Sequence, residues 1–202
     1  MAQIQDGKLI HAKVTLRIVS GIEKGPMSIV RAIVVHQTGG ATAESTFTAY
    51  ENGGNGAHFL ISKDGRIYQT ARVSQQCHHV GKLKSRCLET KTCDAVEAKA
   101  IDGILHQKGK SYSQRVRELH QHELEKAYPS RYPSNEDSIG IELVGRVDPK
   151  TKRYEPTTSL QDTSLKWLRM ELQEHLMLAS SEMFRHPEVS YKQPTEAESA
   201  RW

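Results

Sequence analysis

Two short apolar runs, far apart in the chain, most constrain what it can fold into. Residues 29–36 read IVRAIVVH and residues 138–145 read SIGIELVG. Both are rich in β-branched residues and too short for a core helix, so we expect buried strands of one sheet. In the second run, alternation places residues 139, 141 and 143 on one face and the even-numbered residues, Glu142 among them, on the other.

The remaining segments alternate strand and helix patterns. Thr158 and Gln161 form a capping box for a helix with leucines at core spacing. The other expected elements are a helix at 43–50, a hairpin of strands at 58–62 and 66–70, and a short strand at 183–185. The tail at 186–202 has a loop-like composition. The fold class is therefore α/β of the α+β kind, a single domain with a central mixed β-sheet flanked by helices.

A polar, charged stretch at about 82–135 interrupts this pattern and has no β character. Asp94 can start a helix there, with Val96, Ala100, Ile101 and Leu105 on one face. A second helix is expected from Tyr112 to Ala127, with Val116, Leu119 and Leu124 turned inward and prolines 129 and 133 ending it. We interpret the stretch as a helical insertion, and residues 1–28 as an N-terminal extension packed on the domain.

Composition narrows the range of partners. The 202 residues are enough for one domain with a core, and no apolar run is long enough for a membrane helix. The net charge of +4 suits an acidic polymer such as a cell wall. Basic residues are scattered, without an arginine-rich block, so we expect no nucleic-acid partner. No signal peptide is visible at the amino terminus.

Three cysteines lie close together in the chain. Cys87 and Cys93 could close a short disulfide in an oxidising compartment, or all three thiols could be reduced. Cys77 precedes His78 and His79, but the spacing C-x9-C-x5-C is not that of a known zinc site.

Two histidines and one carboxylate are the first candidates for chemistry. His36 and His186 each follow an apolar segment that leads into a loop, where two imidazoles from neighbouring strands can share a zinc ion. A lone histidine in such a place is more often structural. Glu142 lies in an otherwise apolar strand, either on an exposed face or as a general base whose pKa is set by burial and a nearby metal.

Five motifs together resemble one known family. IVVHQTGG, GAHFLISKDGRIYQT, CHHVG, SIGIELVG and FRHPEVS occur in the order and spacing of the amidase-2 family. The resemblance covers residues 29–202 apart from the insertion. That family includes phage lysozyme-type amidases, muropeptide-recycling amidases and peptidoglycan recognition proteins. The resemblance implies a zinc-dependent N-acetylmuramoyl-L-alanine amidase that acts on peptidoglycan or muropeptides.

The resemblance also implies a ligand set. His36 matches the first zinc histidine and His186 the second. The phage-type third ligand, a cysteine eight residues after the second histidine, is Pro194 here. The recycling type has an aspartate ten residues after that histidine, and this chain has Glu196. We therefore expect Zn²⁺ on His36, His186 and Glu196, with Glu198 as the alternative third ligand.

Further roles are carried over in the same way. Glu142 matches the acidic residue that activates water in many hydrolytic members, and Lys192 matches the phage-type lysine that stabilises the oxyanion. His79 occupies the place of a histidine that lines the substrate cleft, and His58 is expected to contact substrate as well. Ala57 stands where some phage-type members carry a tyrosine, which removes that candidate.

Two rival functions stay open on the sequence. A recognition-type member would bind peptidoglycan without cutting it, as cysteine-less relatives do, and Pro194 favours this hypothesis. A thiol enzyme could use Cys77 with His79.

The place of action is a further expectation. A chain made without a signal peptide could be a cytosolic recycling enzyme, an endolysin, or an antibacterial effector with a cognate immunity protein. The basic charge and the possible Cys87–Cys93 bridge favour the cell wall, in the periplasm of its own or a target cell. No stable membrane insertion is expected, and a monomer is favoured.

Overall fold

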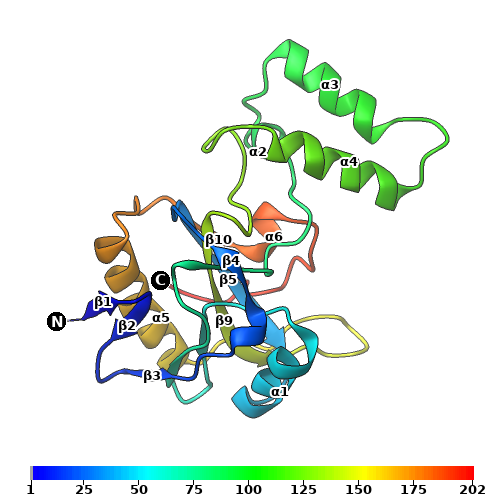
Figure 1. The fold of residues 1–202 in the computed structure, drawn as a ribbon. Helices are drawn as coiled ribbons and strands as arrows, with labels where there is room; N and C mark the ends of the chain where they lie inside the picture. Colours follow the sequence, from blue (N-terminus) through cyan, green and yellow to red (C-terminus); the bar gives the residue numbers. More distant parts are fainter. Residues whose placement is uncertain (1) are drawn as a thin grey trace.

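The computed structural model describes residues 2–202, and its core is a mixed six-stranded sheet. The strand order is β10-β5-β9-β6-β7-β3. The strands are β3 (Val14–Leu16), β5 (Ala32–Gly39), β6 (Phe59–Ile61), β7 (Ile67–Gln69), β9 (Ser138–Arg146) and β10 (Met183–Arg185). Pairing is parallel throughout except between β6 and β7. This confirms the expected α+β fold with a central mixed sheet (Figure 1).

The two apolar runs form the central strands of this sheet. β5 begins at Ala32, not at residue 29, and continues past His36 to Gly39. The expectation that His36 ends its strand is wrong, because β9 offers pairing partners as far as Arg146, opposite Gly39. His36 therefore lies inside β5, with Glu142 as its register partner on β9.

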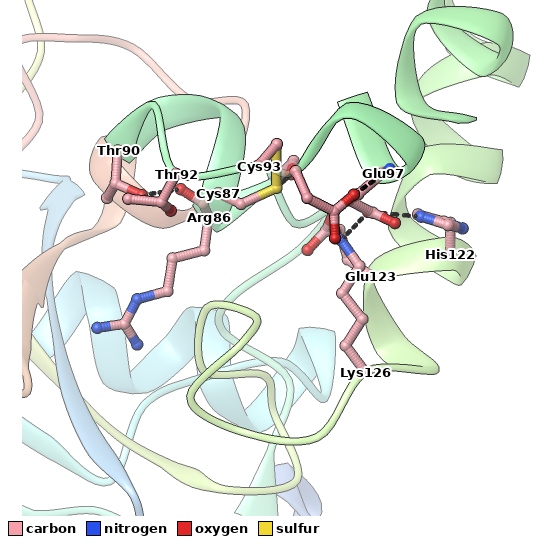
Figure 2. The surroundings of a disulfide bond; sticks show 11 residues. Arg86, Cys87, Thr90, Thr92, Cys93, Glu97, His122, Glu123 and Lys126 are labelled. Atoms are coloured by element: carbon pink, nitrogen blue, oxygen red, sulfur yellow. Dashed lines mark hydrogen bonds and ion pairs between the residues drawn. A yellow bond between two sulfur atoms is a disulfide. The ribbon is translucent and has the colours of Figure 1, made fainter. Parts of the chain in front are cut away.

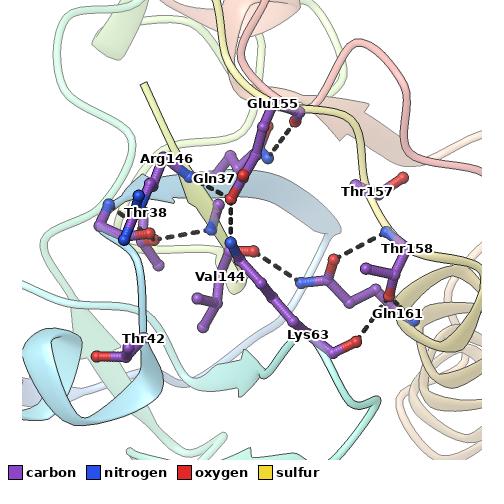
Figure 3. A network of polar contacts seen from close by, with 12 residues as sticks. Gln37, Thr38, Thr42, Lys63, Val144, Arg146, Glu155, Thr157, Thr158 and Gln161 are labelled. Carbon is purple, nitrogen blue, oxygen red and sulfur yellow. Dashed lines mark hydrogen bonds and ion pairs between the residues drawn. The ribbon is translucent and has the colours of Figure 1, made fainter. Parts of the chain in front are cut away.

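One face of the sheet is covered by α5 (Ser159–His175) (Figure 1). The Thr158–Gln161 capping box is present, which confirms that expectation. Three core leucines of the helix, at 165, 168 and 172, are fully buried against Ile139, Ile141 and Leu143. The Gln161 side chain also donates to the carbonyl oxygen of Val144, 2.9 Å away (Figure 3). It donates to the carbonyl oxygen of Ile61 at 3.2 Å as well. These bonds fix the helix start against the sheet.

The segment before β5 is built from short elements. β1 (Gln3–Gln5) and β2 (Lys8–Ile10) form an antiparallel pair, and β3 then joins the central sheet as its edge strand. The 3-10 helix η1 (Ser20–Ile22) leads into β4 (Glu23–Pro26), which pairs with β8 (Gln75–Cys77). Helix α1 (Ala43–Gly53) follows β5 and is capped by the Thr42 side chain.

Three helices between β8 and β9 stand apart from the sheet (Figure 1). They are α2 (Arg86–Thr90), α3 (Ala95–Leu105) and α4 (Tyr112–Leu124). Asp94 caps α3 as expected, and a Cys87–Cys93 disulfide joins α2 to the start of α3 (Figure 2). Of the residues expected on one face of α3, Ile101 is buried but Val96 is 81% exposed, so α3 buries only a narrow stripe. The second helix ends at Leu124, before the expected Ala127.

The chain after β10 contains one element that its composition does not indicate. α6 (His186–Val189) is a single turn with Pro187 at its start, and Glu188 accepts a hydrogen bond from the Arg185 backbone nitrogen at 2.6 Å. Proline and a side-chain cap are ordinary features of a helix start, but one turn is too short to leave a periodic pattern. Within residues 2–202, no helix has the length and apolarity needed to cross a bilayer.

Candidate metal centre and active site

Three side chains from distant parts of the chain converge beside the central strands. His36 comes from β5, His186 from the start of α6 and Glu196 from the C-terminal loop, and all three are buried. Glu196 Oε1 lies 2.8 Å from His186 Nδ1 and 3.6 Å from His36 Nδ1. Their ligand atoms all lie within 4.8 Å of one another. The structure thus brings together the three residues that the sequence nominated for zinc.

The C-terminal loop is held in place by hydrogen bonds to the sheet. The Gln37 side chain, next to His36, accepts a hydrogen bond from Ala197 N at 3.3 Å. It also donates to Glu155 O at 2.8 Å (Figure 3). Arg185 donates to the Ala197 carbonyl oxygen at 3.0 Å. The Gln37 side chain packs directly on Gly145. A Cβ at that position would lie 2.0 Å from the amide nitrogen of Gln37, so only glycine leaves the space that this side chain fills. These contacts position Glu196 between the two histidines.

The proton positions on the histidines leave lone pairs facing Glu196. A carbonyl oxygen only accepts, so His186 Nε2 donates to Val80 O at 2.7 Å and its Nδ1 is unprotonated in the neutral ring. His79 Nε2 likewise donates to Ser138 O at 3.2 Å, which leaves His79 Nδ1 to accept from His36 Nε2 at 3.0 Å. His36 Nδ1 is then also unprotonated. Two nitrogen lone pairs and one carboxylate oxygen therefore face one point without a shared proton.

The protonation states fit a cation at that point. Burial and the nearby His186 lower the pKa of His36 to about 4, so its imidazole is neutral at pH 7. Burial of Glu196 opposes its ionisation, but its close approach to the imidazoles of His186 and His36 outweighs burial and lowers its pKa to about 2. Neutral imidazole and an ionised carboxylate are the ligand forms that zinc binds. The carbonyl acceptor behind His186 is also typical of the outer shell of zinc sites, while His36 is held by the ring nitrogen of His79 instead.

Glu142 lies beside this group on the neighbouring strand. It is half-buried and lines the same cleft of about 590 Å³ as His36, His186 and Glu196. Burial raises its pKa to about 7, while the nearby Tyr50 hydroxyl acts in the opposite direction. A carboxyl group with a pKa near neutrality can both take up and release a proton at physiological pH.

Tyr50 is a site residue that the sequence analysis missed. Its hydroxyl accepts a hydrogen bond from the backbone nitrogen of Ala57 at 3.3 Å, so its own proton is free for Glu142. The residue is 4% exposed, and its ring packs on Gly56, where a Cβ would lie 2.9 Å from the ring. Tyr50 of α1 thus places its hydroxyl within hydrogen-bonding distance of the backbone nitrogen of Ala57. Tyr50 followed by a glycine-rich turn was the only sequence signal.

Comparisons with known proteins decide the family. The family model described as N-acetylmuramoyl-L-alanine amidase, Amidase_2, matches residues 26–198. The chain belongs to the Amidase_2 family. Its members' amidase activity on peptidoglycan is therefore the activity of this chain. A comparison with curated proteins found no matching sequence.

Solved structures agree with this family in fold. A crystal structure of a selenomethionine AmpD derivative is 16% identical, with a TM-score of 0.58, and the match covers 96% of this chain and 90% of that one. The amidase LysC from Clostridium intestinale URNW is 17% identical, with a TM-score of 0.51 and coverage of 90% and 87%. The catalytic domain of XlyA is 15% identical, with a TM-score of 0.50 and coverage of 89% and 87%. At these identities the likeness concerns the fold alone.

The other residues nominated in this Amidase_2 chain differ in where they lie. Lys192 is exposed at the rim of the cleft. His79 also lines the cleft, but its two ring nitrogens bond His36 and Ser138. Its ring therefore orients His36, and its buried surroundings lower its pKa well below the ordinary value.

His58 does not reach the cleft. It is fully buried, its Nδ1 accepts from Gly140 N at 3.0 Å and its Nε2 donates to Gln75 O at 2.8 Å. The expectation that His58 contacts substrate is not met, because both ring nitrogens are used to tie β9 and β8 together. Glu198, the alternative ligand, is exposed and pairs with Arg153 at 3.4 Å, so the geometry favours Glu196.

The cysteines take no part in the site. Cys77 is buried in a small apolar cluster, and burial raises the pKa of its thiol to about 12. A thiol of this kind is not ionised near neutral pH and is a poor nucleophile. His79, its proposed partner, already bonds His36. The thiol-enzyme hypothesis therefore has no support in this geometry.

A second group of possible metal ligands lies in the helical insertion. Glu97, His122 and Glu123 offer three ligand atoms close together. The Lys126 ammonium already lies 2.5 Å from a carboxylate oxygen of Glu97 and of Glu123 (Figure 2). This cluster is an ion-pair network whose cation is a lysine, and it ties α3 to α4.

Proposed function

We propose that this Amidase_2 chain is a zinc-dependent amidase that cleaves the lactyl amide between N-acetylmuramic acid and L-alanine. The observation that carries the proposal is the convergence of two imidazole lone pairs and the ionised Glu196 carboxylate beside Glu142. His36, His186 and Glu196 would hold the ion and leave further coordination positions open to the cleft. A zinc ion there supplies Lewis-acid chemistry, polarising a carbonyl oxygen and making water more acidic.

Glu142 is the general base and then the general acid in this proposal. Its carboxylate takes a proton from the attacking water and passes it to the leaving nitrogen of L-alanine. The Tyr50 hydroxyl orients the carboxylate by donating to it, while the Ala57 nitrogen holds that hydroxyl from the other side. Lys192 at the cleft rim offers an ammonium group for the negative charge that develops on the carbonyl oxygen.

The cell wall is the proposed place of action. The net charge of +4 favours association with an anionic polymer, and the Cys87–Cys93 disulfide persists in oxidising compartments. An endolysin or a delivered antibacterial effector fits this setting better than a cytosolic recycling enzyme. An effector would require a cognate immunity protein in the producing cell.

Digestion of purified sacculi tests the function directly. Mass spectrometry should find stem peptides with a free L-alanine amino terminus, and chelator should abolish their release until zinc is restored. Glu142→Gln should keep stoichiometric zinc and lose most of the activity, about a hundredfold or more as expected for a general base. Intact sacculi despite bound zinc would favour a module that binds without cutting. Undiminished turnover by Glu142→Gln would remove Glu142 from the base role.

A further inference from the structure

A second groove adjoins the cleft and has no role in the chemistry proposed above. It has a volume of about 530 Å³ and lies between the first turns of α4 and the loop after α6. Gly81, Lys82 and Lys192 line both the groove and the cleft, so the two form one continuous depression. The far wall is formed by Tyr112 and Arg117 of the insertion.

The two walls of the groove are tied together in the structure. Leu83 pairs with Ser190 as an isolated antiparallel bridge, which joins the segment before α2 to the loop after α6. The Leu83 backbone nitrogen also donates to His120 Nδ1 of α4 at 3.2 Å. The insertion is thus held at a fixed place beside the cleft, and the groove is a built feature of the fold.

The groove presents positive charges that no carboxylate neutralises. Lys82, Arg117 and Lys192 line it, and none of the three forms an ion pair within residues 2–202. By contrast, the neighbouring Lys84 pairs with Glu89 at 3.5 Å. Three exposed cations around one groove attract an anionic ligand.

Two tyrosines give the groove an aromatic wall. Tyr112 is 63% exposed, and its ring meets that of Tyr191 edge to face, with centroids 6.3 Å apart. Exposed tyrosines are frequent in binding sites, because they offer a large rigid contact surface and a hydroxyl. The groove therefore combines charge with a surface for aliphatic or peptide groups.

We propose that this groove is a subsite for the peptide stem of peptidoglycan beyond L-alanine. The inference rests on the proposed function, in which Lys192 adjoins the bond that is cut and the groove begins on its outer side. The stem carries free carboxylates, whereas the carboxyl group of muramic acid is consumed in the scissile amide and the sugars are neutral. The unpaired cations therefore match the peptide side of the bond and not the glycan side.

Substrate length and a charge reversal test the subsite. The substrates are N-acetylmuramoyl-L-alanine and N-acetylmuramoyl-L-Ala-D-γ-Glu-L-Lys. Arg117→Glu should lower the ratio of kcat/KM for the long over the short substrate by about tenfold, since it replaces an attraction by a repulsion. Lys99→Glu on α3 is the matched control, an exposed cation of the same insertion that lines neither depression, and it should leave the ratio unchanged.

A binding measurement separates failure of the subsite from failure of the proposed function. Calorimetry with the free tripeptide L-Ala-D-γ-Glu-L-Lys needs no turnover, and its Kd should weaken in Arg117→Glu and with added salt. Equal ratios and equal Kd values for wild type and Arg117→Glu would overturn the subsite. If no substrate is cleaved, the proposed function fails while the calorimetry still decides the subsite.

Discussion

Replacing Glu196 with alanine is the sharpest test of the metal centre. The carboxylate is the one group that both candidate histidine ligands face, at 2.8 and 3.6 Å. Its removal leaves two imidazole nitrogens and no charged ligand, so zinc affinity should fall steeply. Because Glu196 lies in a loop held separately by Gln37 and Arg185, the fold should persist in the variant.

The size of the effect follows from linkage. Zinc at a hundred times its Kd stabilises the folded state by about 2.7 kcal/mol. Loss of outer-shell partners alone weakens metal sites by about 10–100-fold, so loss of a ligand should weaken this one by about 100-fold or more. At the same zinc concentration the stabilisation then falls to about 0.4 kcal/mol. For a protein of this size 1 kcal/mol shifts Tm by about 2–4 °C, so a zinc-induced rise of about 5–10 °C should shrink to about 1–2 °C.

Thermal unfolding with and without zinc or chelator measures this shift, and metal analysis gives the stoichiometry. Glu198→Ala is the matched control, since Glu198 is exposed and pairs with Arg153 instead. The control should keep the full zinc-induced rise in Tm. A Glu196→Ala variant with wild-type zinc affinity would refute the ligand assignment, as would a Glu198→Ala variant that loses the metal.

Three further outcomes are expected. Tyr50→Phe should keep zinc but lower kcat about tenfold or more with little change in KM, because the Glu142 carboxylate loses the hydroxyl that orients it. An unchanged kcat would count against a positioning role for Tyr50. Replacing Cys87 and Cys93 with serine should lower the free energy of unfolding by about 2 kcal/mol, because the disulfide closes only a short loop. Denaturant unfolding measures this difference, and equal stability of the two proteins would contradict it. The pKa of Glu23 is lowered because hydrogen bonds to Arg72 outweigh burial, so its ionised carboxylate stabilises the fold above about pH 4.5. This contribution disappears as pH falls through the lowered pKa. Glu23→Gln should therefore reduce the acid-side dependence of the free energy of unfolding on pH, and an unchanged dependence would contradict this role.

Much of the scaffold was determined by the sequence itself. The β-branched runs at 29–36 and 138–145 predicted the two central strands, and the Thr158–Gln161 pair predicted the start of α5, because these signals are local in the chain. The motif order predicted the family, and with it His36, His186 and Glu196 as candidate ligands. Local patterns could not place His36 inside its strand, since the length of β5 depends on how far β9 pairs with it.

The tertiary structure alone decided how the site residues use their polar atoms. His58 and His79 look alike in sequence, yet one ties two strands together and the other orients His36, because their partners are chosen by backbone groups distant in sequence. His186 donates to Val80 O, 106 residues away in the chain, and this bond sets which nitrogen faces Glu196. The Tyr50 hydroxyl lies near Glu142 because the Tyr50 ring packs directly on Gly56, where a side chain would leave no room for it. Such choices depend on contacts between separate elements, which no local pattern encodes.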